Sequence, residues 1–173
     1  MRKLVLSVVG TLLLVLASSA GASPLASSAR ADGQSILQFD TMVGVSGPFV
    51  GSKNPIRGVG GGGLPWVISS GEGQLDSQGQ LEIQVQGLVL ANDPSVPAAL
   101  RLTNPVPLFR GLVSCLSIAD GSPSTVNVMT GNFPASPAGN AEIEATVSLP
   151  QPCFAPIIFV TSPGGAWFAA TGR

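Results

Sequence analysis

The sequence of 173 residues contains no histidine and no tyrosine. Histidine is the most common general base in enzymes, a frequent metal ligand, and the side chain that most often titrates near neutral pH. Without it, a serine or cysteine nucleophile lacks its usual activating base. The absence disfavours an enzyme, although carboxylate and lysine chemistry remain open. We assign no catalytic, cofactor-binding or metal-binding residue and expect no cofactor.

Charged residues are scarce as well, at 10% of the chain, against about 25% in an ordinary globular protein. Eight basic residues stand against nine acidic ones. After the first few residues, the only close basic pair is Lys53 and Arg57. Binding to nucleic acid requires a basic surface that neutralises phosphates. We therefore expect no nucleic-acid partner.

A long apolar run occurs only at the start of the chain. Arg2 and Lys3 precede the apolar residues 4–17, and Ala20-Gly21-Ala22 fits a small-residue cleavage site. This order is typical of a secretory signal peptide. The run is shorter than the roughly 20 residues that a membrane-spanning helix needs. We predict a secreted protein, extracellular or associated with the cell surface, with no membrane span in the mature chain.

Cleavage after Ala22 leaves 151 of the 173 residues, and the alternative is cleavage after Ala31. A chain of about 150 residues is long enough for one domain with a substantial core. We predict a signal peptide over residues 1–22, a flexible lead of small and polar residues over 23–35, and a single β domain over 36–173. The short leader and the lack of an N-x-S/T sequence favour a bacterial source.

The chain has only two cysteines, Cys115 and Cys153. In an exported protein an even number of cysteines indicates a disulfide. The alternative, a catalytic or redox thiol, is disfavoured because neither residue lies in a C-x-x-C pair or near a base. We predict a structural disulfide, which requires Cα atoms no more than about 7 Å apart.

Alternation of apolar and polar residues is clearest at two predicted strands. In Asn140–Leu149, Glu142 and Glu144 lie on the face opposite to the apolar residues. In Gln80–Ala91 the alternation changes phase at Gly87, which is typical of a β-bulge. Both patterns predict strands with one buried and one solvated face.

A turn with Asp76 first and Gly79 last has the residues of a type I turn. It predicts a hairpin between Gln80–Ala91 and a strand at Trp66–Ser70. The other predicted strands are Ile36–Val45, Leu100–Thr103, Leu108–Ala119, Thr125–Thr130, Ile157–Thr161 and Ala166–Ala170.

No convincing helical periodicity follows the leader, so the fold is predicted to be all-β. Short strands separated by turns predict an antiparallel β-sandwich of about eight or nine strands, with a small β-barrel or a jelly roll as alternatives. Trp66 and Trp167 both lie outside the interval between the cysteines, which disfavours an immunoglobulin domain.

Residues 58–63, GVGGGG, match the G-x-G-x-x-G pattern of dinucleotide sites. Such sites need a strand before the glycines and a helix after them. Here the sequence that follows predicts a strand at Trp66–Ser70, so we interpret the glycines as a loop rather than a nucleotide site.

Four side chains are speculative ligand contacts. Trp66 and Trp167 could form an aromatic platform for sugar rings, assisted by the glutamines beside Glu82, although such aromatics more often fill a core. Glu142 and Glu144, about 7 Å apart along one strand face, could form a glycosidase pair. The alternative for the two glutamates is the solvent face of an amphipathic strand, which the alternation favours.

We therefore expect an exported, non-catalytic protein with a binding or structural role at the cell surface or in the medium. Its partner would be a cell-envelope component or a glycan. The alternatives are a carbohydrate-binding module and a carboxylate-type hydrolase.

Overall fold

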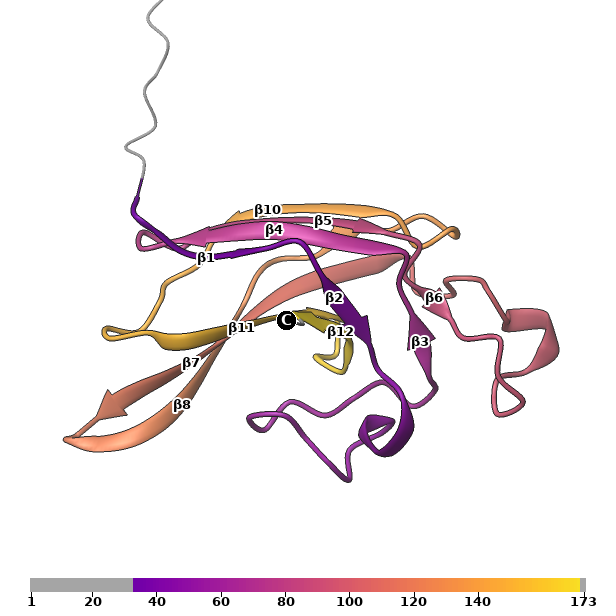
Figure 1. The fold of residues 1–173 in the computed structure, drawn as a ribbon, viewed down its shortest axis with the longest axis horizontal. Helices are drawn as coiled ribbons and strands as arrows, with labels where there is room; N and C mark the ends of the chain where they lie inside the picture. Colours follow the sequence, from indigo (N-terminus) through magenta and orange to yellow (C-terminus); the bar gives the residue numbers. More distant parts are fainter. Residues whose placement is uncertain (1–32, 172–173) are drawn as a thin grey trace, which may run out of the picture. The chain divides into compact units, whose positions relative to one another are not determined.

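The computed structural model describes residues 33–171. The predicted signal peptide and nearly all of the predicted lead lie outside the described residues. The all-β prediction is confirmed: two antiparallel sheets pack face to face as a sandwich (Figure 1). Each of the two sheets keeps two edge strands in residues 33–171, so neither closes into a barrel.

The first sheet has four strands in the order β1-β4-β5-β10. Their bounds are β1 Ser35–Phe39, β4 Ser70–Asp76, β5 Gln80–Gln86 and β10 Ala141–Thr146. The second sheet has six strands, in the order β2-β12-β11-β7-β8, with β9 pairing with β7. Their bounds are β2 Met42–Gly44, β7 Leu108–Ala119, β8 Ser122–Met129, β9 Phe133–Pro134, β11 Phe154–Thr161 and β12 Trp167–Thr171.

Three smaller elements complete the described chain. The strands β3 (Trp66–Val67) and β6 (Val89–Leu90) form a two-stranded ribbon. Short 3-10 turns occupy Gly47–Phe49 (η1) and Ala98–Leu100 (η2).

The two sheets meet through the apolar side chains that alternation places on one face of each strand. Leu81, Ile83 and Ile143 are at most 1% exposed, while the residues between them are exposed or half-buried. Gly111 of β7 lies against this face, because a Cβ atom added there would be 3.0 Å from Leu81 Cδ2. The sheets are therefore in direct contact, and burial of their inner faces supplies the main stabilisation.

The prediction of one strand at Ile36–Val45 is wrong. The chain bends at Asp40 and Thr41, so that β1 belongs to the four-stranded sheet and β2 to the six-stranded sheet. The bend also reverses the parity: Phe39 and Met42 are both buried, whereas Val43 is 60% exposed.

The predicted hairpin turn at Asp76–Gly79 is confirmed, but its first arm was placed wrongly. Trp66–Ser70 is not one strand, because β3 ends at Val67 and β4 begins at Ser70. β4 pairs with β5 across the turn, and β3 pairs with β6 beyond Gly87, where the ladder is interrupted. Gly79 has φ of 86°, a conformation that glycine adopts without strain.

The predicted strand at Leu100–Thr103 is also wrong. A 3-10 turn, η2, follows Pro97 instead, and Leu102 has φ of 56°, which lies outside the extended region. The segment is held by single backbone hydrogen bonds: Leu90 N–H donates to Thr103 O at 3.0 Å, and Leu102 N–H donates to Leu90 O at 2.9 Å.

The glycine-rich segment that matched the G-x-G-x-x-G pattern packs on the six-stranded sheet, on the side away from the four-stranded sheet (Figure 1). Gly61 forms a parallel bridge with Trp167, supported by Trp167 N–H donating to Gly60 O at 2.9 Å and Gly62 N–H donating to Trp167 O at 2.8 Å. The glycines let the backbone approach its own sheet. The next element is the strand β3 rather than a helix, which confirms that the segment lacks the context of a nucleotide site.

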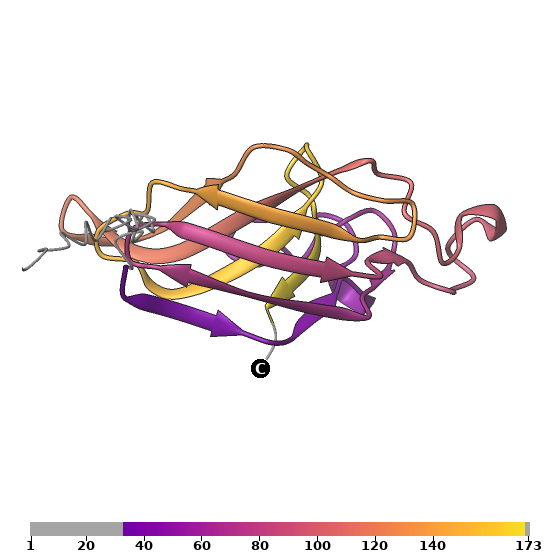
Figure 2. The same cartoon turned by 90° about the horizontal axis from the view of Figure 1, so that it is seen from above.

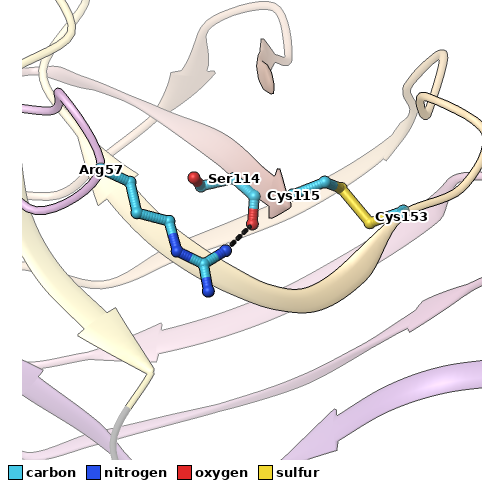
Figure 3. Close-up of a disulfide and its surroundings, with 4 residues drawn as sticks. All are labelled: Arg57, Ser114, Cys115 and Cys153. Carbon is cyan, nitrogen blue, oxygen red and sulfur yellow. Dashed lines mark hydrogen bonds between the residues drawn. A yellow bond between two sulfur atoms is a disulfide. The ribbon is translucent and has the colours of Figure 1, made fainter. Parts of the chain in front are cut away.

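The predicted disulfide is confirmed. Cys115 in the middle of β7 is bonded to Cys153, which lies just before β11, with Cα atoms 5.0 Å apart. Figure 3 shows the disulfide next to Ser114, whose carbonyl oxygen accepts a hydrogen bond of 2.9 Å from Arg57 Nη1. Two cross-links, one covalent and one polar, thus join β7 to segments distant in sequence.

The disulfide predicts a measurable loss of stability on its removal. Cys115→Ala/Cys153→Ala should lower the free energy of unfolding by up to about 4 kcal/mol, because the closed loop spans 38 residues and its constraint on the unfolded chain is lost. Urea unfolding followed by tryptophan fluorescence measures the difference. Wild-type protein in reductant is the matched control, and a loss below about 1 kcal/mol in both would contradict a stabilising role.

The packing of the glycine-rich segment yields a second prediction. Gly61→Ala should destabilise the fold by about 1–3 kcal/mol, because its Cβ atom would lie 2.0 Å from the Phe49 carbonyl oxygen. Gly63→Ala is the matched control, since a Cβ atom there meets nothing within 4 Å. Equal stability of the two variants in urea unfolding would show that this segment is not packed against Phe49.

Candidate functional site

The outer face of the four-stranded sheet carries a groove with a volume of about 630 Å³. It crosses β1, β4, β5 and β10, which Figure 2 shows side by side from above. We call it the polar groove. It is lined by Gln38, Phe39, Asp40, Glu72, Gly73, Gln74, Glu82, Ile83, Gln84, Glu142 and Glu144. Phe39 and Ile83 are buried, and the side chains that face solvent end in carboxylate and amide groups.

Strand register places these side chains in two rows across the sheet. In the first row Gln38 is the partner of Gln74, Gln74 of Glu82, and Glu82 of Glu144. In the second row Glu72 is the partner of Gln84, and Gln84 of Glu142. Partner side chains on one face lie about 5 Å apart. One extended ligand can therefore contact several carboxylates and amides at once.

Hydrogen bonds inside the groove use the amide donors. Gln74 Nε2 donates to Glu82 Oε2 at 2.8 Å, and Gln84 Nε2 donates to Glu142 Oε1 at 3.4 Å. A carboxylate only accepts hydrogen bonds, and an amide oxygen accepts as well. With amide donors engaged in this way, the groove presents mainly acceptors to a ligand.

No lysine or arginine is among the residues that line the groove, all of which the structure describes. The described arginines are used elsewhere: Arg57, Arg101 and Arg110 donate to the carbonyl oxygens of Ser114, Val96 and Thr130. The five carboxylates of the groove thus produce a region of negative potential, which attracts cationic groups.

One cross-strand pair in the groove is unfavourable for stability. Glu82 and Glu144 are direct partners on β5 and β10. Like charges directly opposite each other destabilise a sheet, by roughly 0.2–1 kcal/mol. Placing these two carboxylates side by side therefore lowers the stability of the sheet locally. Glu142 lies two residues from Glu144 on the same face.

The two predicted aromatic contacts do not lie in the groove. Trp66 is 3% exposed and stacks on Phe168, with ring centroids 4.0 Å apart, inside the sandwich. Trp167 is 4% exposed and packs between Phe49 and Phe159. Both rings fill core space, so the surface carries no platform made of these two tryptophans.

Glu142 and Glu144 were among the predicted ligand contacts, whereas Asp40 and Glu72 were not. Glu72 was missed because Gly71 and Gly73 occupy two of the three inward positions of β4, where apolar residues beside Leu75 would have marked a strand. Added Cβ atoms there would collide with the side chains of Met42 and Phe39, which fill this space. The available signal was the polar half of the alternation, at residues 70, 72, 74 and 76.

The carboxylates at turns have structural roles. Asp76 Oδ1 accepts hydrogen bonds from the backbone N–H groups of Gln78 and Gln80, at 2.8 and 2.9 Å. The side chain and backbone of Ser95 both donate to Asp93 Oδ1, which lowers the pKa of that carboxyl below its usual range. Within residues 33–171, no three acidic or cysteine side chains come together in a metal-binding arrangement.

Comparison with protein-family models, curated proteins and solved structures gave no match. In the part of the chain that the structure describes, no helix is both long and apolar enough to cross a membrane. The site must therefore be interpreted from its own chemistry.

Proposed function

We propose that this protein is exported and acts without catalysis, by binding a ligand in the polar groove at the cell surface or in the medium. Export is supported by the signal-peptide pattern of residues 1–22 and by the disulfide, which is typical of oxidising compartments. The observation that carries the binding role is the groove itself, in which carboxylates and amides from all four strands line one continuous surface.

The ligand chemistry follows from the acceptor-rich lining. Such a surface binds groups that donate hydrogen bonds, and its negative potential favours donors that carry positive charge. The groove is open and elongated across the strands, which suits an extended chain rather than a compact molecule. A glycan with free amino groups as well as hydroxyls combines these properties.

The first test is titration with a glucosamine oligosaccharide, followed by calorimetry. Glu82→Gln and Glu144→Gln should each weaken binding about tenfold, because each removes one charge-assisted hydrogen bond. The same variants should unfold at equal or higher urea concentration, since each relieves the repulsion between the two partners. Loss of binding together with gained stability cannot be attributed to misfolding.

Asp120→Asn is the matched control. It removes one negative charge at the turn between β7 and β8, outside the groove lining, and should leave binding unchanged. The N-acetylated oligosaccharide tests the part played by the amino groups. Equal affinity of the wild-type protein and the groove variants would overturn the proposed site.

A second candidate, a carboxylate-type hydrolase, is favoured by one observation. Glu142 and Glu144 were the predicted pair, and the structure adds Glu82 directly opposite Glu144. Glycosidases use two carboxylates about 5–5.5 Å apart to retain, or about 6.5–9.5 Å apart to invert, the anomeric configuration. Side chains of cross-strand partners, such as Glu82 and Glu144, lie about 5 Å apart, and those of alternate residues on one strand, such as Glu142 and Glu144, lie about 7 Å apart. These separations match the two ranges.

This candidate is tested by turnover rather than by binding. If the groove hydrolyses glycosides, Glu144→Gln and one of its two candidate partners, Glu82→Gln or Glu142→Gln, should each lower the rate on aryl glycosides by at least about 100-fold, because each removes the acid or the nucleophile. Glu72→Gln, outside both candidate pairs, is the control. Binding of an oligosaccharide that remains intact after prolonged incubation with the wild-type protein would exclude hydrolysis of that substrate and leave the binding role.

A further inference from the structure

The two large sheets have four edge strands: β1, β10, β2 and β8. Unpaired edges invite pairing with another chain, and proteins shield them by shortness, bulges or charge. β2 is 3 residues long, β1 has a register shift between Ser35 and Leu37, and β10 carries Glu142 and Glu144. Three of the four edges are thus shielded.

The fourth edge, β8, lacks these devices over most of its length. It has 8 residues, SPSTVNVM, and none of them is charged. Its register against β7 runs from Ser122 to Met129 without a shift. Pro123 lacks an N–H group and shields only the end near the turn.

One hydrogen bond shows which backbone groups of β8 point away from β7. Thr130 N–H donates to Gly111 O at 2.9 Å, next to the partners Leu112 and Met129. Hydrogen-bonded and non-hydrogen-bonded pairs alternate in an antiparallel ladder. Thr125, Asn127 and Met129 therefore direct N–H and C=O away from β7. Within residues 33–171, no strand or side chain pairs with these backbone groups.

We propose that β8 pairs antiparallel with β8 of a second copy of this chain, with Asn127 at the two-fold axis. In this register Thr125 faces Met129 of the second copy, and Asn127 faces its own counterpart. Each such pair exchanges both N–H···O=C bonds, so the outward groups are satisfied on both chains. The two six-stranded sheets become one continuous sheet.

The two-fold register and the lack of charge on β8 favour a second copy as the partner. A charged edge repels its own copy because like charges meet, and β10 would bring glutamates against glutamates. β8 has no charged residue. Two copies therefore meet at this edge without electrostatic opposition.

The side chains beside β8 support the same register. Phe154 pairs with Leu116, and Leu116 with Thr125, which forms one row on the outer face of the sheet. Phe154 and Leu116 are 58% and 42% exposed. Met129 of the second copy extends this row past Thr125. Pairing thus continues an apolar row across the edge and reduces the exposure of Met129, which is 45% exposed in one chain.

The test is the oligomeric state by analytical ultracentrifugation over a range of concentrations. The wild-type protein should dimerise. Thr125→Lys/Met129→Lys should weaken the dimer about tenfold or more, because each lysine faces a lysine of the second copy. Thr125→Glu/Met129→Glu should weaken it similarly. A mixture of the two double variants should restore dimers, since every lysine then faces a glutamate.

Glu142→Lys/Glu144→Lys, on the shielded edge β10, is the control and should leave dimerisation unchanged. In the wild-type protein, the amides of Thr125, Asn127 and Met129 should exchange with solvent more slowly as concentration rises. Three results would each overturn the proposal: a wild-type monomer up to about 1 mM, a dimer unaffected by the double lysine variant, or a mixture that stays monomeric although both variants have wild-type circular dichroism.

Discussion

Burial of two apolar sheet faces against each other is the interaction on which the rest of this structure depends. With charged residues at only 10% of the chain, the described residues gain little from ion pairs, and most buried side chains are aliphatic or aromatic. Alternation then has a strict consequence: every residue between two inward residues points outward. On the four-stranded sheet, the inward residues of this alternation form the core, and the outward residues line the polar groove.

Glycine lets two parts of the chain approach more closely than side chains would permit. On the inner side of β4, Gly71 and Gly73 leave room for Met42 and Phe39, which tie the bend between β1 and β2 to the core. On the opposite outer face, Gly61 lies against the backbone of Phe49 and beside Trp167. At Gly71 and Gly73 the missing Cβ atom makes space for apolar side chains, whereas at Gly61 it lets two backbone segments lie against each other.

The sequence was sufficient where alternation was complete and insufficient where glycine replaced an apolar residue. β5 and β10 could be predicted because their inward positions are apolar, and β7 because apolar residues occupy both of its faces, although Gly111 is one of its inward residues. The disulfide could be predicted because two cysteines allow only one pairing. β4 could not, since its inward glycines show no hydrophobic period. The bend at Asp40 was not predicted either, because the apolar residues on both sides of it suggested a single strand. β1 and β2 are separate strands because they belong to different sheets, which the local sequence does not show.

Alternation within one strand shows which residues share a face but not which strands are neighbours, and this explains which parts of the candidate site could be predicted. Glu142 and Glu144 lie on a strand with complete alternation, so their shared face followed from the sequence. Their cross-strand neighbours did not, because register depends on turns and sheet order rather than on any single strand. Trp66 and Trp167 were considered both as a surface platform and as core side chains, because the sequence does not show which segments cover them. Trp167 is buried between Phe49 and Phe159, and its backbone forms a bridge with Gly61 of a segment whose composition had indicated only a loop.

The two proposed surfaces are compatible because they lie on different sheets. The polar groove occupies the outer face of the four-stranded sheet, whereas β8 is an edge of the six-stranded sheet. Pairing through β8 would therefore leave both grooves of a dimer open. A polymeric ligand that reached both grooves would be held with a higher avidity than either groove provides, because the second contact becomes intramolecular. An open groove with modest affinity for each sugar unit would gain most from such pairing, since extended glycans repeat the same donors along their length.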